Sequence, residues 1–164
     1  MKLTWAKALI IPLFLLAACS KGREFDEKYY AKENSALWME YVNAIGIPIE
    51  SMAGNVLIVA NSTACGPCIN EIRYWDLAQD DLDTDIFLIL VDKYSGSYRS
   101  FLSNLDIELP AFQDSAGLIF EYELIPPPPV KIFFNAEGDV EMIYPAGAGG
   151  RKEHFLEQIN RELQ

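Results

Sequence analysis

The sequence is poor in cysteine, histidine and basic residues, and each shortage narrows the functions open to it. Thirteen Lys and Arg residues stand against 24 Asp and Glu residues, which gives a net charge of −11. Nucleic acid and anionic lipid are bound through clustered cations, so this charge argues against both as broad partners. The only histidine, His154, lies far along the chain from the cysteines, and we interpret it as a surface residue. Nothing in the sequence predicts a cofactor.

The residues that are present suffice for one globular domain. The chain has 164 residues, and 51% of them are hydrophobic. This length allows one substantial hydrophobic core but not two, and the aromatic content argues against disorder. The chain shows no internal repeat, and its low-complexity segment is the proline run from Pro126 to Pro129.

The first residues have the pattern of an export leader. Two lysines precede an apolar stretch over residues 8–18, which is shorter than the ~20 residues that span a bilayer. The stretch ends in Leu16-Ala17-Ala18-Cys19, which resembles the bacterial lipobox, where small residues precede a cysteine that receives lipid. This resemblance implies a cleaved lipoprotein signal peptide over residues 1–18 and a lipidated Cys19. The alternative is an ordinary signal peptide with a chance cysteine.

The remaining chain alternates strand and helix patterns. Buried strands are predicted over residues 55–60 and 85–91, and a hairpin over 130–134 and 140–144 around the turn at Asn135–Asp139. Helices are predicted over residues 29–45, 65–80, 97–105, 115–122 and 151–163, with Ile69, Ile72, Trp75 and Leu77 facing inward from the second of these. We therefore expect a tether and an N-terminal helix over residues 19–50. An α/β domain over residues 51–164 follows, with a mixed central sheet flanked by helices on both faces.

Two cysteines, Cys65 and Cys68, are placed between a predicted buried strand and a predicted helix. Unpaired N–H groups and the helix dipole favour an anion at a helix N-terminus, so the pKa of the Cys65 thiol is expected to be lowered. Pro67 suits the first helical turn, and Gly66 permits close approach of a partner chain. This placement predicts reversible dithiol–disulfide exchange, in which Cys65 attacks a substrate and the more buried Cys68 resolves the mixed disulfide.

Two other interpretations of the cysteine pair stay open. The pair could be a structural disulfide. It could also be half of a zinc site, although structural zinc takes four ligands and the chain offers few others. Both alternatives leave the predicted strand–helix placement without a chemical purpose.

The tetrapeptide Cys65-Gly66-Pro67-Cys68 and the downstream segment Pro129–Gly138 together resemble the thioredoxin superfamily, in particular its membrane-tethered TlpA/ResA-type thiol–disulfide oxidoreductases. The resemblance covers about residues 50–164 and implies a thioredoxin-like fold. It also implies that Pro129 is a cis-proline facing the cysteines, with Pro128 as the other candidate and a stiff polyproline connector as the alternative. It further implies that Glu71 accepts a proton from the resolving thiol, whereas the alternative is an exposed carboxylate favoured by the helix dipole.

The sequence departs from that family at several positions near the cysteines. Ala64 replaces the usual Trp, Val59 stands where thioredoxin buries an acid, and Arg73 replaces a helix-kinking proline. These departures affect the expected rate, potential and substrate surface but leave the dithiol in place. They also keep open a lipid-anchored binding or scaffold protein with an inert cysteine pair. A peroxidase is less favoured, because Thr63 and Arg73 do not match the pattern around a peroxide-reducing cysteine.

The resemblance implies an enzyme of the bacterial cell envelope that faces the periplasm or the outside and contributes to redox homeostasis there. Its expected partners are exported proteins that contain disulfides, the membrane through the lipid anchor, and a membrane electron donor if the enzyme is a reductase. Gly66-Pro67 between the cysteines resembles the reducing members, so disulfide reduction is the favoured direction. An oxidase or isomerase would use the same cysteines.

Overall fold

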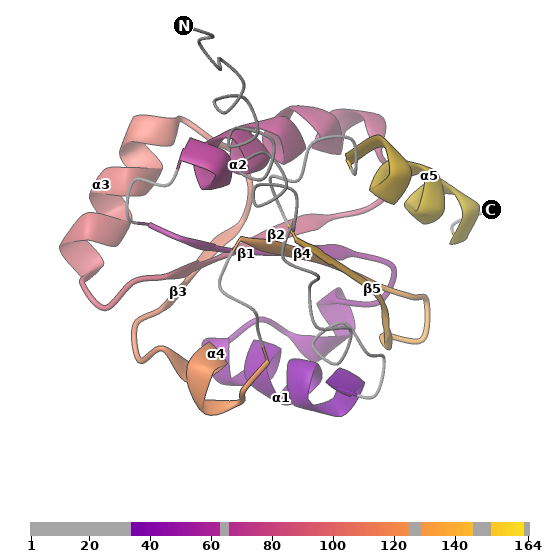
Figure 1. Cartoon of the computed structure of the whole chain (residues 1–164), viewed down its shortest axis with the longest axis horizontal. Coiled ribbons are helices and arrows are strands. Elements are labelled where there is room, and N and C mark those ends of the chain that lie inside the picture. Colours follow the sequence, from indigo (N-terminus) through magenta and orange to yellow (C-terminus); the bar gives the residue numbers. More distant parts are fainter. Residues whose placement is uncertain (1–33, 63–65, 125–128, 146–151, 163–164) are drawn as a thin grey trace, which may run out of the picture.

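A mixed sheet lies between two layers of helices in the computed structural model, which describes residues 34–62, 66–124, 129–145 and 152–162 (Figure 1). The strands are β1 (Val56–Asn61), β2 (Ile86–Val91), β3 (Ala111–Asp114), β4 (Val130–Phe134) and β5 (Val140–Pro145). The α-helices are α1 (Ser35–Ile45), α2 (Gly66–Ala78), α3 (Ser95–Leu105), α4 (Leu118–Glu121) and α5 (Lys152–Glu162), and short 3-10 helices span η3 (Ile49–Ser51) and η4 (Gln79–Asp81). The predicted α/β class and the mixed sheet are confirmed.

The strand order across the sheet is β3-β2-β1-β4-β5. The first three of these strands are mutually parallel, whereas β4 runs antiparallel to both β1 and β5. Five of the six residues of β1 and of β2 are buried, as the continuous apolar runs predict for strands covered on both faces. The predicted hairpin is also confirmed, with Asn135 Oδ1 accepting the backbone N–H of Asp139 at 2.8 Å and Gly138 at φ 84°.

The structure corrects two sequence-based expectations. Strand β3 was not predicted, because it has four residues and only Asp114 in it is buried, so no continuous apolar run marks it. It nevertheless pairs in parallel with β2 and forms one edge of the sheet. Leu77 was expected to face inward from α2 but is 77% exposed, because the buried face of that helix runs through Cys68, Glu71, Ile72 and Trp75.

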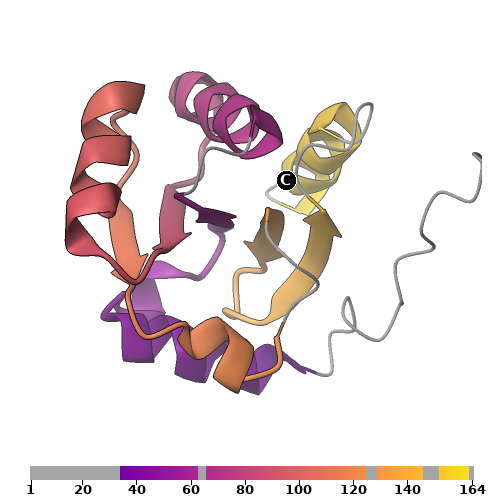
Figure 2. The same ribbon diagram turned by 60° about the vertical axis from the view of Figure 1, so that its left-hand side comes forward.

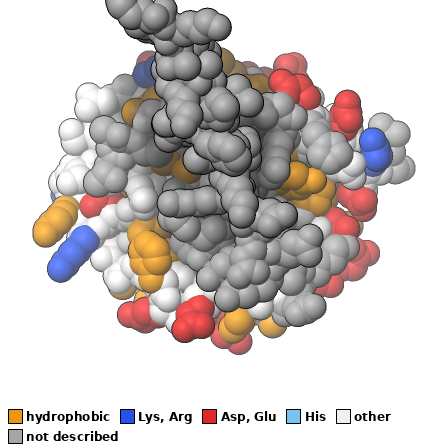
Figure 3. Space-filling view, in the orientation of Figure 1, with side chains coloured by type: hydrophobic (Ala, Val, Ile, Leu, Met, Phe, Trp, Pro, Cys, Tyr) orange, Lys and Arg blue, Asp and Glu red, His pale blue; other side chains and the backbone are white. Residues whose placement is uncertain are grey.

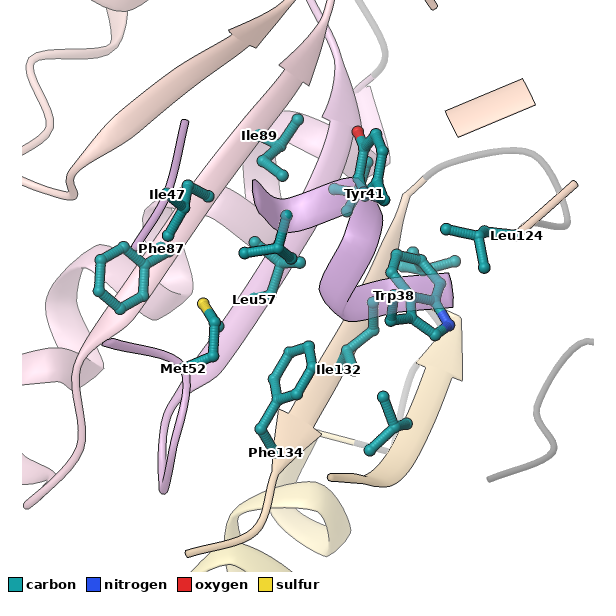
Figure 4. Close-up of a cluster of buried hydrophobic side chains, with 14 of the residues drawn as sticks. Trp38, Tyr41, Ile47, Met52, Leu57, Phe87, Ile89, Leu124, Ile132 and Phe134 are labelled. Atoms are coloured by element: carbon teal, nitrogen blue, oxygen red, sulfur yellow. The ribbon is translucent and has the colours of Figure 1, made fainter. Parts of the chain in front are cut away.

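The two faces of the sheet carry separate hydrophobic clusters. Helices α1 and α4 cover one face, and α2, α3 and α5 cover the other (Figures 1 and 2). On the first face, Trp38 and Tyr41 from α1 pack with Leu57, Ile89 and Ile132 from three strands (Figure 4). The second cluster has Trp75 from α2 and Phe155 from α5 over β1, β2 and β4.

Strand alternation decides which residues of β4 enter each cluster. Val130, Ile132 and Phe134 belong to the first cluster and Phe133 belongs to the second. Lys131 shares the face of Phe133, because side chains two residues apart point to the same side of a strand. Helix α1 ends at Ile45, as predicted, and Gly46 caps it with a φ of 91°, the left-handed conformation that glycine adopts readily. Among the described residues, no helix has the length and apolar character needed to cross a membrane.

Candidate active site

The carboxyl ends of the parallel strands β1, β2 and β3 lie at the same end of the sheet, where α2 begins. Ser62 follows β1, Asp92 follows β2 and Asp114 ends β3. The buried Ser62 hydroxyl donates a hydrogen bond to Asp92 Oδ2, and Gln113 Nε2 donates to the carbonyl oxygen of Asp92 at 2.8 Å. These contacts tie the three strand ends together directly before the segment that precedes α2.

Cys68 lies in the first turn of α2 and has no exposed surface, although Gly66 and Pro67 before it are exposed. It is disulfide-bonded in the structure. The other two cysteines of the sequence, Cys65 and Cys19, lie outside the described residues, so the predicted Cys65–Cys68 pairing and the lipidation of Cys19 stay predictions. The first turn of α2 therefore presents its backbone at Gly66 to solvent and keeps the Cys68 sulfur beneath the surface.

Glu71 lies on the same face of α2 as Cys68, since residues three apart on a helix are neighbours. Its side chain is fully buried, so the alternative of an exposed carboxylate in the first helical turn is wrong. Two donors converge on Glu71 Oε1: the Trp75 indole Nε1 at 2.8 Å and the Lys131 ammonium Nζ at 2.8 Å. A buried carboxylate is costly unless it is paired and hydrogen-bonded, and here both conditions are met.

Lys131 brings the positive charge to this buried carboxylate. Its side chain is fully buried in β4, and its Nζ lies 5.7 Å from the centre of the Trp75 ring and 5.4 Å from that of Phe155. The quadrupoles of the two aromatic rings favour a cation at these distances. Elements α2, β4 and α5 thus surround the buried ion pair of Glu71 and Lys131.

Pro129 directly precedes β4 and is half-buried. Val130, the first residue of β4, pairs with Val59 near the carboxyl end of β1. The start of β4 therefore lies beside the strand end that leads toward α2. Pro128 lies outside the described residues, and the predicted cis bond at Pro129 stays a prediction.

Sequence reasoning missed Lys131, Ser62 and Asp92 as members of this site. Of these three residues, Lys131 could most easily have been found from the sequence. It is a lysine between two apolar residues of a buried strand, and a buried lysine needs a buried partner. Which acid supplies that partner could not be read from the chain, since 60 residues separate Lys131 from Glu71.

Within the described residues, no group of three or more His, Cys, Asp and Glu side chains is arranged to hold a metal ion. The polar groups at this edge of the sheet have other contacts. Asp92 accepts hydrogen bonds from Ser62 and from the Tyr94 backbone N–H. Asp114 accepts the backbone N–H groups of Gly117, Leu118 and Ile119 at 2.8, 2.9 and 3.1 Å. Those three bonds fix the start of α4.

Solved structures with this architecture identify the class of fold. A protein from Chlorobium tepidum, assigned as a thiol:disulfide interchange protein DsbE, is 19% identical with a TM-score of 0.64, and the match covers 70% of this chain and 83% of that one. A secreted disulfide oxidoreductase from Mycobacterium tuberculosis, homologous to DsbE of Escherichia coli, is 19% identical with a TM-score of 0.55 over 68% and 84% of the two chains. No protein-family model and no curated protein sequence matches the chain.

These likenesses establish that the chain has the thioredoxin-like fold, as the cysteine motif and the Pro129 segment predict. By their names, both of these neighbours are proteins of thiol–disulfide exchange. A third structure with this fold is a protein from Bacteroides thetaiotaomicron, assigned as a protein disulfide isomerase. It is 20% identical with a TM-score of 0.56 over 70% of this chain and 77% of that one.

Proposed function

We propose that this protein is a thiol–disulfide oxidoreductase that reduces disulfides in exported proteins through Cys65 and Cys68. The observation that carries the proposal is the buried, disulfide-bonded Cys68 in the first turn of α2, with the buried Glu71 carboxylate one helical turn further on. Only two residues separate Cys68 from Cys65, which makes Cys65 the natural partner of that disulfide. The names of the structural neighbours support the same chemistry.

The proposed reaction begins with the dithiol form. The Cys65 thiolate attacks a substrate disulfide, a bond forms between Cys65 and one substrate sulfur, and the other substrate sulfur leaves and takes up a proton. Cys68 then gives its proton to Glu71 and attacks the Cys65 sulfur. The Cys65–Cys68 bond forms, the second substrate sulfur leaves and is protonated, and two electrons have passed from the dithiol to the substrate.

Pro129 is proposed to position the substrate strand. It stands at the start of β4, beside the end of β1, where an extended peptide would meet the exposed Gly66. A dithiol donor at the membrane would return Cys65 and Cys68 to the reduced form by the same exchange. The choice of reduction over oxidation is part of the proposal and depends on the redox potential of the pair.

Insulin reduction in the presence of excess dithiothreitol tests the function. We expect the purified full-length chain to speed insulin precipitation, and we expect Cys65→Ser to lose this activity. In a separate reaction without dithiothreitol, Cys68→Ser should accumulate a mixed disulfide with insulin. Cys19→Ala, the matched control at the third cysteine, should keep full activity in the insulin assay. If Cys65 reacts with a thiol reagent no faster than an unperturbed thiol at neutral pH and insulin precipitation is unchanged, a binding protein with an inert pair would replace this proposal.

A redox titration against glutathione tests the direction. A redox potential of about −270 mV supports a reductase, whereas a value of about −120 mV would make the protein an oxidase. The titration needs no protein substrate, so its result is separate from the insulin assay. We expect the more negative value because Gly66-Pro67 resembles the reducing members of the superfamily.

We propose further that the domain is held on the outer side of a bacterial membrane. The support is the leader pattern over residues 1–18 and the lipobox-like segment that ends at Cys19. The proposed tether starts at Cys19, and the proposed N-terminal segment runs to residue 50. Cys19→Ala is expected to move the protein from the membrane fraction to the soluble fraction of cells, and an unchanged distribution would argue against lipidation.

A further inference from the structure

The burial of Lys131 is the least expected feature of the second face of the sheet. Lysine is among the residues least often buried completely, and this one lies in a strand whose five residues are all buried. Its ammonium group reaches Glu71 Oε1 at 2.8 Å and lies over the Trp75 and Phe155 rings. Strand β4 thus places the Lys131 ammonium among buried apolar side chains, where an apolar residue would be expected to pack at least as well.

A buried ion pair is a weak source of net stability. The cost of removing two charges from water is about as large as their attraction, and apolar replacements of such pairs are often neutral or stabilising. Stability alone therefore does not explain why Lys131 and Glu71 are both present. A functional reason is indicated by their place, because Glu71 follows Cys68 by one helical turn and Lys131 follows Pro129 by two residues.

We propose that Lys131 is a positioning residue of the exchange reaction: its ammonium group keeps the buried Glu71 carboxylate charged and oriented, so that Glu71 accepts the Cys68 proton at neutral pH. This inference rests on the proposed function of Cys65 and Cys68. Lys131 acts through Glu71 and does not contact the substrate.

The physical reason is the response of a buried carboxyl to a neighbouring cation. Burial without a counter-ion favours the protonated form and raises the pKa of a carboxyl, and a protonated Glu71 accepts no further proton. A cation at hydrogen-bond distance opposes that shift, and the Trp75 indole N–H on the same oxygen favours the charged form as well. Without Lys131, the acceptor would become available only at higher pH.

Other ionisable groups lie on the elements around this pair. Cys68 and Tyr74 lie on α2, Tyr144 of β5 pairs with Lys131 in register, and Glu153 lies on α5. The pKa of Tyr74 is raised by burial, then by the charges of Glu153 and Glu71. A raised pKa keeps the proton on Tyr74 over about pH 6 to 9, the range in which Cys68 and the Glu71–Lys131 pair are tested.

The first test measures the resolving step directly. The full-length chain is loaded with a glutathione mixed disulfide at Cys65, and the rate of glutathione release is followed from about pH 6 to pH 9. We expect Lys131→Met to slow release about tenfold or more at pH 7 and to move the pH profile upward by at least about one unit. Lys131→Arg should restore most of the rate, and Lys93→Met, an exposed lysine, should match the wild type.

The double variant decides whether Lys131 acts through Glu71. Glu71→Gln removes the carboxylate, so adding Lys131→Met to it should change neither the rate nor the pH profile further. If Lys131→Met alone does not fold, the double variant can still be compared with Glu71→Gln. The double variant is expected to fold because it buries no unpaired charge. A further loss of rate in the Glu71→Gln background, or an unshifted profile in Lys131→Met, would overturn the inference.

A readout without turnover separates this inference from the proposed function. The pKa of the Glu71 carboxyl is measured by carbon NMR in the reduced wild type and in the Lys131→Met or Lys131→Gln variant. We expect the value to rise when the cation is removed. An unchanged carboxyl pKa overturns the role of Lys131 even if the enzyme is active, whereas a raised value with no disulfide exchange in the wild type places the failure in the proposed function.

Discussion

Two tryptophans, Trp38 and Trp75, are both fully buried but differ in one hydrogen bond. The Trp75 indole Nε1 donates to the Glu71 carboxylate at 2.8 Å. The Trp38 indole Nε1 is buried and has no hydrogen-bond partner in the part of the chain that the structure describes. Phenylalanine keeps an aromatic ring at both positions, over which Lys131 can still lie at position 75, so the comparison mainly reports the contribution of the Trp75 donor to a buried carboxylate.

We expect Trp75→Phe to lower the free energy of unfolding by about 1.5–3 kcal/mol more than Trp38→Phe does, since a hydrogen bond to a charged group contributes about that much. Urea unfolding of both variants, followed by circular dichroism, measures the difference. Trp38→Phe is the matched control, because it removes a donor that has no acceptor among the described residues. Equal losses in the two variants would show that the Trp75–Glu71 bond adds nothing to stability.

At the scale of elements, Asp114 links α1, β3 and α4. It ends β3, and its carboxylate accepts the first backbone N–H groups of α4. The Tyr41 hydroxyl from α1 donates to the same carboxylate at 3.3 Å. Burial, followed by the Asp114 charge and this hydrogen bond, raises the pKa of Tyr41 far above its ordinary value. Helix α1 is therefore hydrogen-bonded to the end of β3, near the site.

The raised pKa of Tyr41 predicts a loss of stability in alkali. The unfolded chain releases the tyrosine proton above about pH 10, whereas the folded chain retains it, so the contribution is complete below pH 10 and falls as the pH rises further. We expect Tyr41→Phe to be less stable than the wild type at pH 8, because it loses a bond, and to lose less stability between about pH 10 and 11. Urea unfolding midpoints measured across this range give the slope of stability against pH for each variant.

Tyr94→Phe provides the control for that comparison, because Tyr94 is 66% exposed. Its slope between about pH 10 and 11 should equal that of the wild type. If the Tyr41→Phe slope also equals that of the wild type, the proton held by Tyr41 in the folded state does not contribute to the alkaline transition.

At the scale of the whole molecule, acidic side chains outnumber basic ones nearly two to one. The full sequence has 24 Asp and Glu residues and 13 Lys and Arg residues. Acidic side chains are spread around the visible rim of the molecule, with few basic ones between them (Figure 3). The exposed pair Arg161–Glu157, with 4.0 Å between its charged atoms, is of a kind that contributes little in water. Net repulsion therefore acts on the folded surface.

We expect the free energy of unfolding to rise as NaCl increases from about 0.01 to 0.5 M, because the Debye length falls from about 30 Å to under 10 Å and screens that repulsion. Denaturation by urea, which is uncharged, measures the effect without adding ions. KCl at equal ionic strength is the control and should give the same rise. A fall with salt would mean that attractive surface pairs outweigh the net negative charge.

The sequence determined the elements that local patterns encode. Apolar runs marked β1 and β2, the turn residues from Asn135 to Asp139 marked the hairpin, and the cysteine motif marked the start of α2. The resemblance of that motif and of the Pro129 segment also pointed to the thioredoxin-like fold. The inward face of α2 was predicted in part, since Ile72 and Trp75 are buried and Leu77 is not.

Which distant residues meet depends on the tertiary structure. It added β3 to the edge of the sheet, buried Glu71 and set Lys131 against it from another element. Local patterns follow from backbone geometry and side-chain periodicity within a few residues, so they are written in the order of the chain. The Glu71–Lys131 pair depends instead on how a helix packs across a strand 60 residues away, and packing is a property of the folded whole.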